Sequence, residues 1–152
     1  EVYPAMQKMS RDRCRTPMAW SNAPNGGFSP ENITTWLPLN PEYADGVNVA
    51  DEMANNASLL HFYKRLIALR KATPALLCGD YAPLDVTNAL VLAFIRHYEG
   101  QTCTVLLNFT GMVQMVTLSA PMTLLFSSAD RATIGENEVL FPYEVVIISQ
   151  TA

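Results

Sequence analysis

The stretch of residues 58–71 is the one segment with an unambiguous helical period. Apolar side chains recur there at three- and four-residue spacing, at Leu59, Leu60, Phe62, Tyr63, Leu66, Ile67 and Leu69. This spacing predicts an amphipathic helix. Ser58 can cap the first turn, and Thr73-Pro74 ends the helix because the residue before a proline avoids the helical region. A lone helix cannot bury its apolar face, so we expect this one to pack on another element.

Residues 1–57 show no sustained period of either kind. They contain six prolines and the pair Gly26-Gly27, which is typical of loop. Such a long loop is uncommon in a compact domain, so it is either functional or packs on a surface outside this segment. We expect its aromatic residues to pin the loop to a neighbouring surface rather than to stack on a ligand; these are Trp20, Phe28, Trp36 and Tyr43. Residues 47–57 are predicted to contain one short helical turn.

After Pro74 the pattern changes to short apolar runs separated by turn residues. The predicted strands are Leu76–Leu84, Leu90–Tyr98, Cys103–Thr110, Val113–Leu118, Met122–Ser127 and Tyr143–Ser149. A hairpin turn is expected at Glu99-Gly100-Gln101, another turn near Thr110-Gly111, and a longer loop over residues 127–138. Strands at close spacing, without an intervening helical pattern, predict a mainly β fold: an antiparallel sandwich or barrel.

Composition excludes several classes of protein. The net charge is −4, and eight of the ten Lys and Arg residues precede Pro74, so we expect no nucleic-acid partner. No apolar run approaches the roughly 20 residues of a membrane span, so we expect a soluble chain without a membrane partner. The first residues lack an initiator Met and the plan of a secretion signal, and are interpreted as a cut end. Cys14, Cys78 and Cys103 are odd in number and widely spaced, which predicts reduced thiols, a cytoplasmic protein, and no metal or cofactor.

No nucleotide-binding, hydrolase or metal-binding motif is present. The stretch Ser10–Trp20, with its Arg15-Thr-Pro-Met18 cluster, nevertheless resembles the C-terminal part of α-glucosidases of the α-amylase superfamily. This group holds oligo-1,6-glucosidases, dextran glucosidases and trehalose-6-phosphate hydrolases. The resemblance continues in short stretches along the chain: 25–29, 36–41, 48–49, 58–60, 63–64, 66–71, 74–76 and 79–81, and more loosely 108–109 and 142–145. Arg13-Cys14 and Ala19 depart from the family pattern, which usually has Asn-Ala and Gln there.

The resemblance implies a domain organisation. Residues 1–74 would be the last βα loop and the final helix of a (β/α)8 catalytic barrel, and residues 75–152 a C-terminal β-sandwich domain. The helix over residues 58–71 would then pack on the barrel, which is absent from this chain. The implied parent is a retaining α-glucosidase acting on short oligosaccharides or disaccharides.

The family's three catalytic carboxylates lie upstream of every matched motif, so the resemblance implies no catalytic residue in this chain and an inactive fragment. Asp12, Asp80 and Asp130 are expected to be isolated surface or turn carboxylates. His61 and His97 are expected to face solvent or to pack.

Arg15 is the one candidate substrate-binding residue. In the family, the arginine of this motif pairs with an early barrel aspartate and hydrogen-bonds the terminal sugar. A guanidinium suits both tasks because its fixed fork can bind a carboxylate and a hydroxyl together. The alternative is an arginine that only orders its loop, as we expect for Arg11, whose partner would be Asp12 or backbone carbonyls.

The rival interpretation is a stand-alone sugar-binding or structural β module. A binding module needs an exposed aromatic platform on its sheet face. Aromatic residues in and beside the predicted strands are few and mixed with aliphatic ones; they are Phe94, Tyr98, Phe109, Phe126 and Tyr143. This composition favours a structural role over a binding role for that half of the chain.

Overall fold

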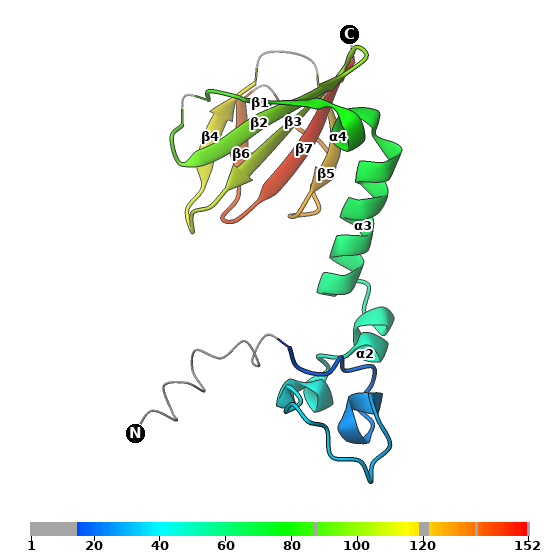
Figure 1. Cartoon of the computed structure of the whole chain (residues 1–152). Helices are drawn as coiled ribbons and strands as arrows, with labels where there is room; N and C mark the ends of the chain where they lie inside the picture. The colour runs from blue at the N-terminus through cyan, green and yellow to red at the C-terminus, as the bar shows by residue number, and fades with distance from the viewer. Residues whose placement is uncertain (1–14, 87, 119–121, 136, 152) are drawn as a thin grey trace, which may run out of the picture. The chain divides into compact units, whose positions relative to one another are not determined.

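The computed structural model describes residues 15–86, 88–118, 122–135 and 137–151 (Figure 1). It divides into two compact units, one of residues up to Leu66 and one of residues from Ile67 onward. The division falls inside helix α3 (Leu59–Ala72). None of the described helices is long and apolar enough to cross a membrane.

Helix α3 begins and ends one residue later than predicted. Ser58 caps it as expected, because its hydroxyl oxygen accepts a hydrogen bond from the amide of His61 at 3.3 Å. The same hydroxyl donates to the carbonyl of Glu52 at 2.7 Å. At the other end Thr73 is extended, and Pro74 opens a new helix, α4 (Pro74–Cys78).

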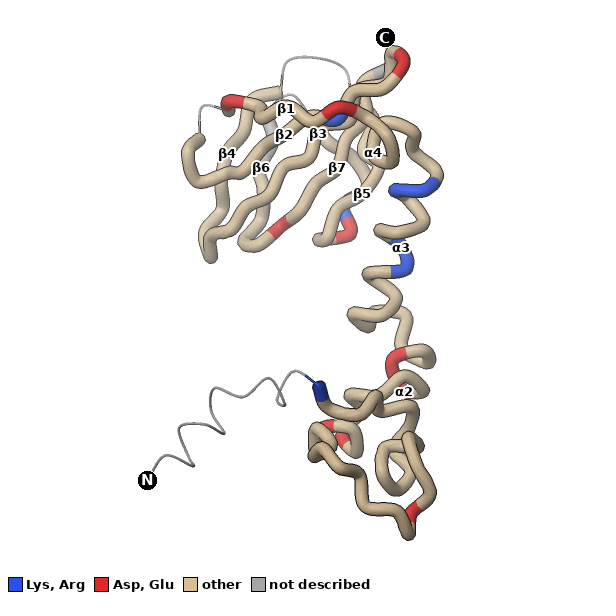
Figure 2. The backbone as a smooth tube through the Cα atoms, viewed as in Figure 1, with Lys and Arg blue, Asp and Glu red and all other residues tan. Residues whose placement is uncertain are grey.

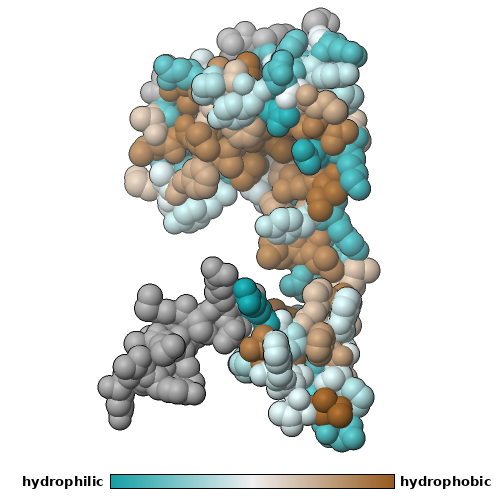
Figure 3. All heavy atoms as spheres, viewed as in Figure 1, coloured by the Kyte–Doolittle hydropathy of each residue, from teal (hydrophilic) through white to brown (hydrophobic). Residues whose placement is uncertain are grey.

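The apolar face of α3 is not covered by the residues that the structure describes. None of its residues is buried, and Leu59, Tyr63 and Ile67 are 63%, 58% and 52% exposed. Figure 3 shows apolar surface gathered along the helix. The described residues therefore do not supply the element on which the sequence predicts this helix to pack.

The N-terminal unit is loop with short helical segments, in agreement with the sequence. The segments are η2 (Pro24–Gly27), η3 (Pro41–Asp45) and α2 (Val49–Ala54), the last within the predicted helical turn. The carbonyl of Gly26 accepts from the amides of Trp20 and Ser21 at 2.7 and 3.1 Å. Gly26 is buried at φ 62°, and a Cβ there would press on Ala19, so the tight turn requires glycine.

Helix α2 is held to this turn by its own first amides. Val49 and Ala50 donate to the carbonyls of Ala19 and Trp20, each at 3.0 Å. Asn48 caps α2, because its side chain accepts from the amide of Asp51 at 3.0 Å and donates to the carbonyl of Tyr43 at 2.8 Å. These bonds fix the loop around residues 15–20 without any strand in the described part of the unit.

The C-terminal unit is built from antiparallel strands, which confirms the β prediction. The strands are β1 (Asp80–Pro83), β2 (Val91–Tyr98), β3 (Gln101–Asn108), β4 (Gln114–Thr117), β5 (Thr123–Ser127), β6 (Asn137–Leu140) and β7 (Val145–Thr151). One sheet has the order β1-β2-β3-β7-β5, and β4 and β6 form a second, two-stranded sheet. All pairings are antiparallel.

The hydrophobic core of this unit draws side chains from both sheets. Its buried members are Val91, Ala93, Leu106, Val116, Leu118, Leu140, Val146 and Ile148. The members on β2 and on β7 are two positions apart, as expected for one face of a sheet, and Leu106 is the member on β3. On the other face of the larger sheet, α4 lies against β2 and β3, and the amide of Ala75 donates to the side chain of Gln101 at 3.0 Å.

The hairpin between β2 and β3 forms at the predicted turn. Tyr98 pairs with Gln101, so the loop consists of Glu99 and Gly100, whose φ angles are both positive at 44° and 83°. Positive φ angles at both loop residues are typical of the type I′ turn, whose twist matches that of the two strands of a hairpin. The expected turn near Thr110-Gly111 is also present as a bend.

Two strand predictions need correction. The expected strand Leu76–Leu84 is helical over its first part, since α4 continues to Cys78, and only Asp80–Pro83 is a strand. Proline at the first helical position and good helix formers after it favour this start. The expected loop over residues 127–138 contains the start of β6, which pairs with β4. With two polar residues among its four, this strand has too little apolar alternation to be recognised.

Candidate functional site

Arg15 is the first described residue and lies in a segment without regular secondary structure. Its exposed side chain lines a concavity of about 500 Å³ in the N-terminal unit. The guanidinium has no hydrogen-bond or ion-pair partner among the described residues. Its N–H donors are therefore available to a ligand or to a carboxylate from another part of a larger protein.

Aromatic side chains form part of the same concavity. Trp36 is 94% exposed and Phe28 about half exposed. The segment that carries them is tied together by Asn25, whose side-chain amide donates to the carbonyls of Pro30 and Ile33, each at 2.8 Å. Asn25 has a φ of 55°, a conformation that asparagine tolerates better than most residues. For Phe28 and Trp36, the surface on which they were expected to pack is thus not provided by the described residues.

The chemistry of this concavity suits a polyhydroxylated molecule. Aromatic rings offer flat apolar surface, and the guanidinium offers directed donors for hydroxyl oxygens. Ser29 adds a buried hydroxyl that has no hydrogen-bond partner among the described residues. No carboxylate is among the described residues that line this concavity.

A neighbouring concavity of about 400 Å³ shares Thr16, Pro17 and Met18 with the first. Its polar groups are already used in holding the fold. Asn48 caps α2, and the carboxylate of Glu52 accepts from the amide of Leu60 at 3.0 Å. We therefore assign this second concavity a structural role.

The other titratable residues singled out in the sequence are scattered. Asp12, Arg11 and Cys14 lie outside the described residues. Asp80 is an exposed residue at the start of β1, and Asp130 is exposed in a turn at φ 52°. Among the residues that the structure describes, no group of three His, Cys, Asp or Glu side chains could hold a metal ion.

Both histidines make local contacts of the expected packing kind. His61 Nε2 lies 3.1 Å from the carbonyl of Met53, and His97 Nδ1 lies 2.9 Å from Thr102 Oγ1. Cys78 and Cys103 are free thiols, as predicted. Burial raises the pKa of Cys103 above its ordinary value, and a hydrogen bond with Ser149 partly opposes that shift.

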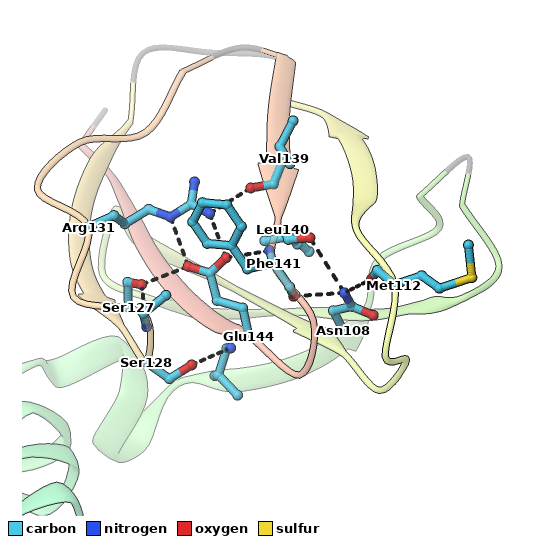
Figure 4. A network of polar contacts seen from close by, with 11 residues as sticks. Asn108, Met112, Ser127, Ser128, Arg131, Val139, Leu140, Phe141 and Glu144 are labelled. Carbon is cyan, nitrogen blue, oxygen red and sulfur yellow. Dashed lines mark hydrogen bonds and ion pairs between the residues drawn. The ribbon is translucent and has the colours of Figure 1, made fainter.

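A buried charge network in the C-terminal unit was not predicted from the sequence (Figure 4). Glu144 is buried just before β7, and its carboxylate accepts hydrogen bonds from Arg131 Nε at 2.8 Å and Nη2 at 2.5 Å. It also accepts from Ser127 Oγ at 2.7 Å and from the amide of Phe141 at 2.8 Å. Arg131 in turn donates to the carbonyl of Val139 at 2.6 Å and lies over the ring of Phe141.

Asn108 forms a second polar centre in the same region. Its side-chain amide donates to the carbonyls of Met112 and Phe141, each at 2.8 Å, and its oxygen accepts from the amide of Thr110 at 2.9 Å. Its own backbone amide donates to the carbonyl of Glu144 at 2.9 Å. The two loosely matched motifs, 108–109 and 142–145, therefore meet in space. A lone Glu between aromatic residues and an apolar strand was the signal that could have revealed the network.

Both basic side chains of the C-terminal half make hydrogen bonds within the chain. Arg96 and Arg131 are the only Lys or Arg residues after Pro74 (Figure 2). Arg96 donates from Nε and Nη2 to the carbonyl of Gly79 at 3.0 and 2.6 Å. Neither arginine is arranged to bind an anion at the surface of the sheet.

Comparisons with known proteins place the chain in a family. Residues 1–79, a little over half of the chain, match the family described as "Alpha amylase, catalytic domain". A glucan 1,6-alpha-glucosidase of Streptococcus dysgalactiae subsp. equisimilis is 34% identical over 148 residues, which are 97% of this chain and 27% of the relative. An oligo-1,6-glucosidase of Halalkalibacterium halodurans is 37% identical over 142 residues, which are 88% of this chain and 25% of the relative.

Solved structures agree with these matches. The trehalulose synthase of Pseudomonas mesoacidophila MX-45 superposes with a TM-score of 0.80 and 34% identity, over 92% of this chain and 26% of that one. The chain thus spans about a quarter of the length of the relatives it matches. Because the family match and the matches to individual proteins agree along the sequence, the chain belongs to the α-amylase family.

Proposed function

We propose that this chain is the C-terminal part of a retaining α-glucosidase that cleaves α-glucosidic bonds in short oligosaccharides or disaccharides. The observation that carries the proposal is the identity of 34% and 37% to a glucan 1,6-alpha-glucosidase and an oligo-1,6-glucosidase over most of the chain. Both relatives are named for an activity on α-glucosidic bonds. The parent's substrate belongs to this class, and the odd number and wide spacing of the cysteines support a cytoplasmic location.

Residues 1–74 form the end of the catalytic barrel in this proposal, and residues 75–152 form a C-terminal β-sandwich domain. The family match over residues 1–79 supports the first part. A single core that draws side chains from both sheets supports the second. The exposed apolar face of α3 fits a helix whose partner is the rest of the barrel.

Within the parent, Arg15 binds the terminal sugar and pairs with a barrel carboxylate. Its unpartnered guanidinium and the neighbouring Trp36 and Phe28 support this role. In this proposal the chain itself is structural and non-catalytic. The proposal is supported by the lack of a carboxylate among the described residues that line the concavity around Arg15, since glycoside hydrolysis requires two.

The rival proposal, a stand-alone sugar-binding module, finds less support. On the outer face of the larger sheet Tyr81 and Phe94 form one aromatic pair, with ring centroids 5.3 Å apart and planes tilted by 39°. A tilted pair does not make the flat platform on which a sugar ring would stack.

An activity assay tests the proposal. The chain alone and the full-length parent should be incubated with p-nitrophenyl α-glucoside, and the anomer first released by the parent should be identified by NMR. We expect no turnover by the chain above a heat-killed control, and release of α-glucose by the parent. Turnover by the isolated chain, or a parent that inverts or lacks activity, would contradict it.

A further inference from the structure

The space between the two sheets is lined by apolar side chains in the core, but polar side chains also line it at one end of the C-terminal unit. Along β3 and β7, Leu106 and Ile148 belong to the apolar core, but two residues farther toward this end the same faces carry Thr104 and Gln150. Thr102 and Gln150 are direct partners on neighbouring strands. Here the core gives way to a cavity of about 310 Å³.

Thr104 is the unusual residue of this cavity. It is 3% exposed, and its hydroxyl makes no hydrogen bond to another described residue. Among the described residues the buried side-chain polar atom without a partner is Ser29 Oγ, so the Thr104 hydroxyl is instead open to the cavity and available to a molecule held there. Gln150 and Asp85 line the same space, and Thr102 is already hydrogen-bonded to His97.

Apart from Thr117, the other described residues of the cavity wall are apolar. Ile95, Leu118 and Met122 contribute to it, together with Leu84 and Val86. A few polar groups set in an apolar wall are typical of small-molecule sites, which begin at about 300 Å³. One water needs only about 30 Å³ of liquid volume, so the cavity is much larger than a site for a single buried water.

We propose that this cavity binds a small neutral polyhydroxylated molecule of about monosaccharide size, held by Thr104, Gln150 and Asp85. A hydroxyl, an amide and a carboxylate together match ligand hydroxyls, which both donate and accept hydrogen bonds. No Lys, Arg or His is among the described lining residues, so no cationic side chain there would favour an anionic ligand. The site lies wholly in the C-terminal unit and does not depend on the function proposed for Arg15.

An NMR titration of the whole chain tests this site. Amide shifts are followed while glucose is added, and cyclohexanol serves as a probe of similar size with a single hydroxyl. We expect saturable shifts at Thr102, Thr104 and Gln150 with glucose, and weaker binding of cyclohexanol. Thr104→Val should weaken glucose binding about tenfold, the value of one lost hydrogen bond.

Matched variants separate binding from folding. Thr104→Ser keeps the hydroxyl and should keep glucose binding, and Thr123→Val, at an exposed position of β5, should bind as the unaltered chain does. Thr104→Val should have an equal or higher melting temperature, because the hydroxyl that it removes makes no hydrogen bond to another described residue. The proposal is overturned if glucose causes no saturable shift, if cyclohexanol binds as well, or if a folded Thr104→Val variant binds glucose normally.

Discussion

At the scale of single residues, Glu144 and Arg131 show how a charge is tolerated inside a β unit of this size. The side chain of Glu144 is fully buried and that of Arg131 is 12% exposed. Removing such charges from water is costly, and the cost is offset only when geometry is good and the remaining lone pairs are satisfied. Both conditions hold here, since each carboxylate oxygen accepts one bond from the guanidinium and one from Ser127 or Phe141.

Removal of one partner should therefore be far more damaging than removal of both. We expect Arg131→Met to lower the free energy of unfolding by about 3 to 5 kcal/mol, because it leaves a buried carboxylate without its cation. The double variant Arg131→Met with Glu144→Gln should lose less than the sum of the two single variants. Urea unfolding followed by fluorescence measures all three.

Lys71→Met is the matched control for this experiment, since it removes a cation from an exposed position on α3. A surface substitution of this kind should change stability by no more than about 0.5 kcal/mol. Additive losses in the double variant would show that Arg131 and Glu144 are not energetically coupled.

At the scale of elements, the start of α3 is tied to the end of α2 by side chains rather than by apolar packing. Ser58 bonds both the amide of His61 and the carbonyl of Glu52, and the Glu52 carboxylate bonds the amide of Leu60. These bonds satisfy amides that a helix leaves unpaired in its first turn. The arrangement of the end of α2 against the start of α3 is therefore held by two polar side chains, those of Ser58 and Glu52.

We expect Ser58→Ala to lower stability by about 1 kcal/mol and to reduce helix content, because the cap is lost. Ser58→Thr keeps both the acceptor and the donor and should restore most of the loss. Circular dichroism during thermal unfolding measures both quantities. Equal stability of Ser58→Ala and the unaltered chain would mean that the cap is not formed in solution.

The sequence predicts best those elements that are determined by residues close together along the chain. The α3 helix follows from its apolar period and its cap, and the hairpin at Glu99-Gly100 follows from turn chemistry. Strand β6 could not be predicted, because Asn137–Leu140 becomes a strand only through its pairing with β4. The run after Pro74 is apolar and short, a pattern shared by buried strands and short helices, so the sequence predicts a strand over part of α4.

The residues of the candidate site are even farther apart along the sequence, so the sequence pattern gives little indication of the site. Arg15 was singled out only through the resemblance of its motif, and nothing in its period or spacing marks it. The Phe28 and Trp36 side chains that share its concavity are separated from it along the chain and are brought there by the bonds of Asn25. The buried network of Glu144 likewise joins residues from three segments, which no single stretch of sequence reveals.

At the scale of the whole molecule, the chain presents groups that its own residues do not satisfy. The apolar face of α3 is exposed, Arg15 has no partner among the described residues, and Trp36 is almost fully exposed. The relatives it matches are about four times as long. In our proposal these groups meet their partners in the rest of the parent, so the role of Arg15 must be tested there.

We expect Arg15→Ala in the full-length parent to lower kcat/KM for p-nitrophenyl α-glucoside by at least about a hundredfold, roughly 2.7 kcal/mol of transition-state stabilisation. The loss has two sources: a sugar hydroxyl loses its donor, and a buried carboxylate loses its cation. Arg15→Lys should recover little, since an ammonium keeps the charge but not the planar fork. A role confined to ordering the loop would instead lower the melting temperature and leave kcat/KM of the folded fraction nearly unchanged. Normal kcat/KM in a well-folded Arg15→Ala parent would exclude the substrate role, because a guanidinium that grips the terminal sugar cannot be removed without loss at the transition state.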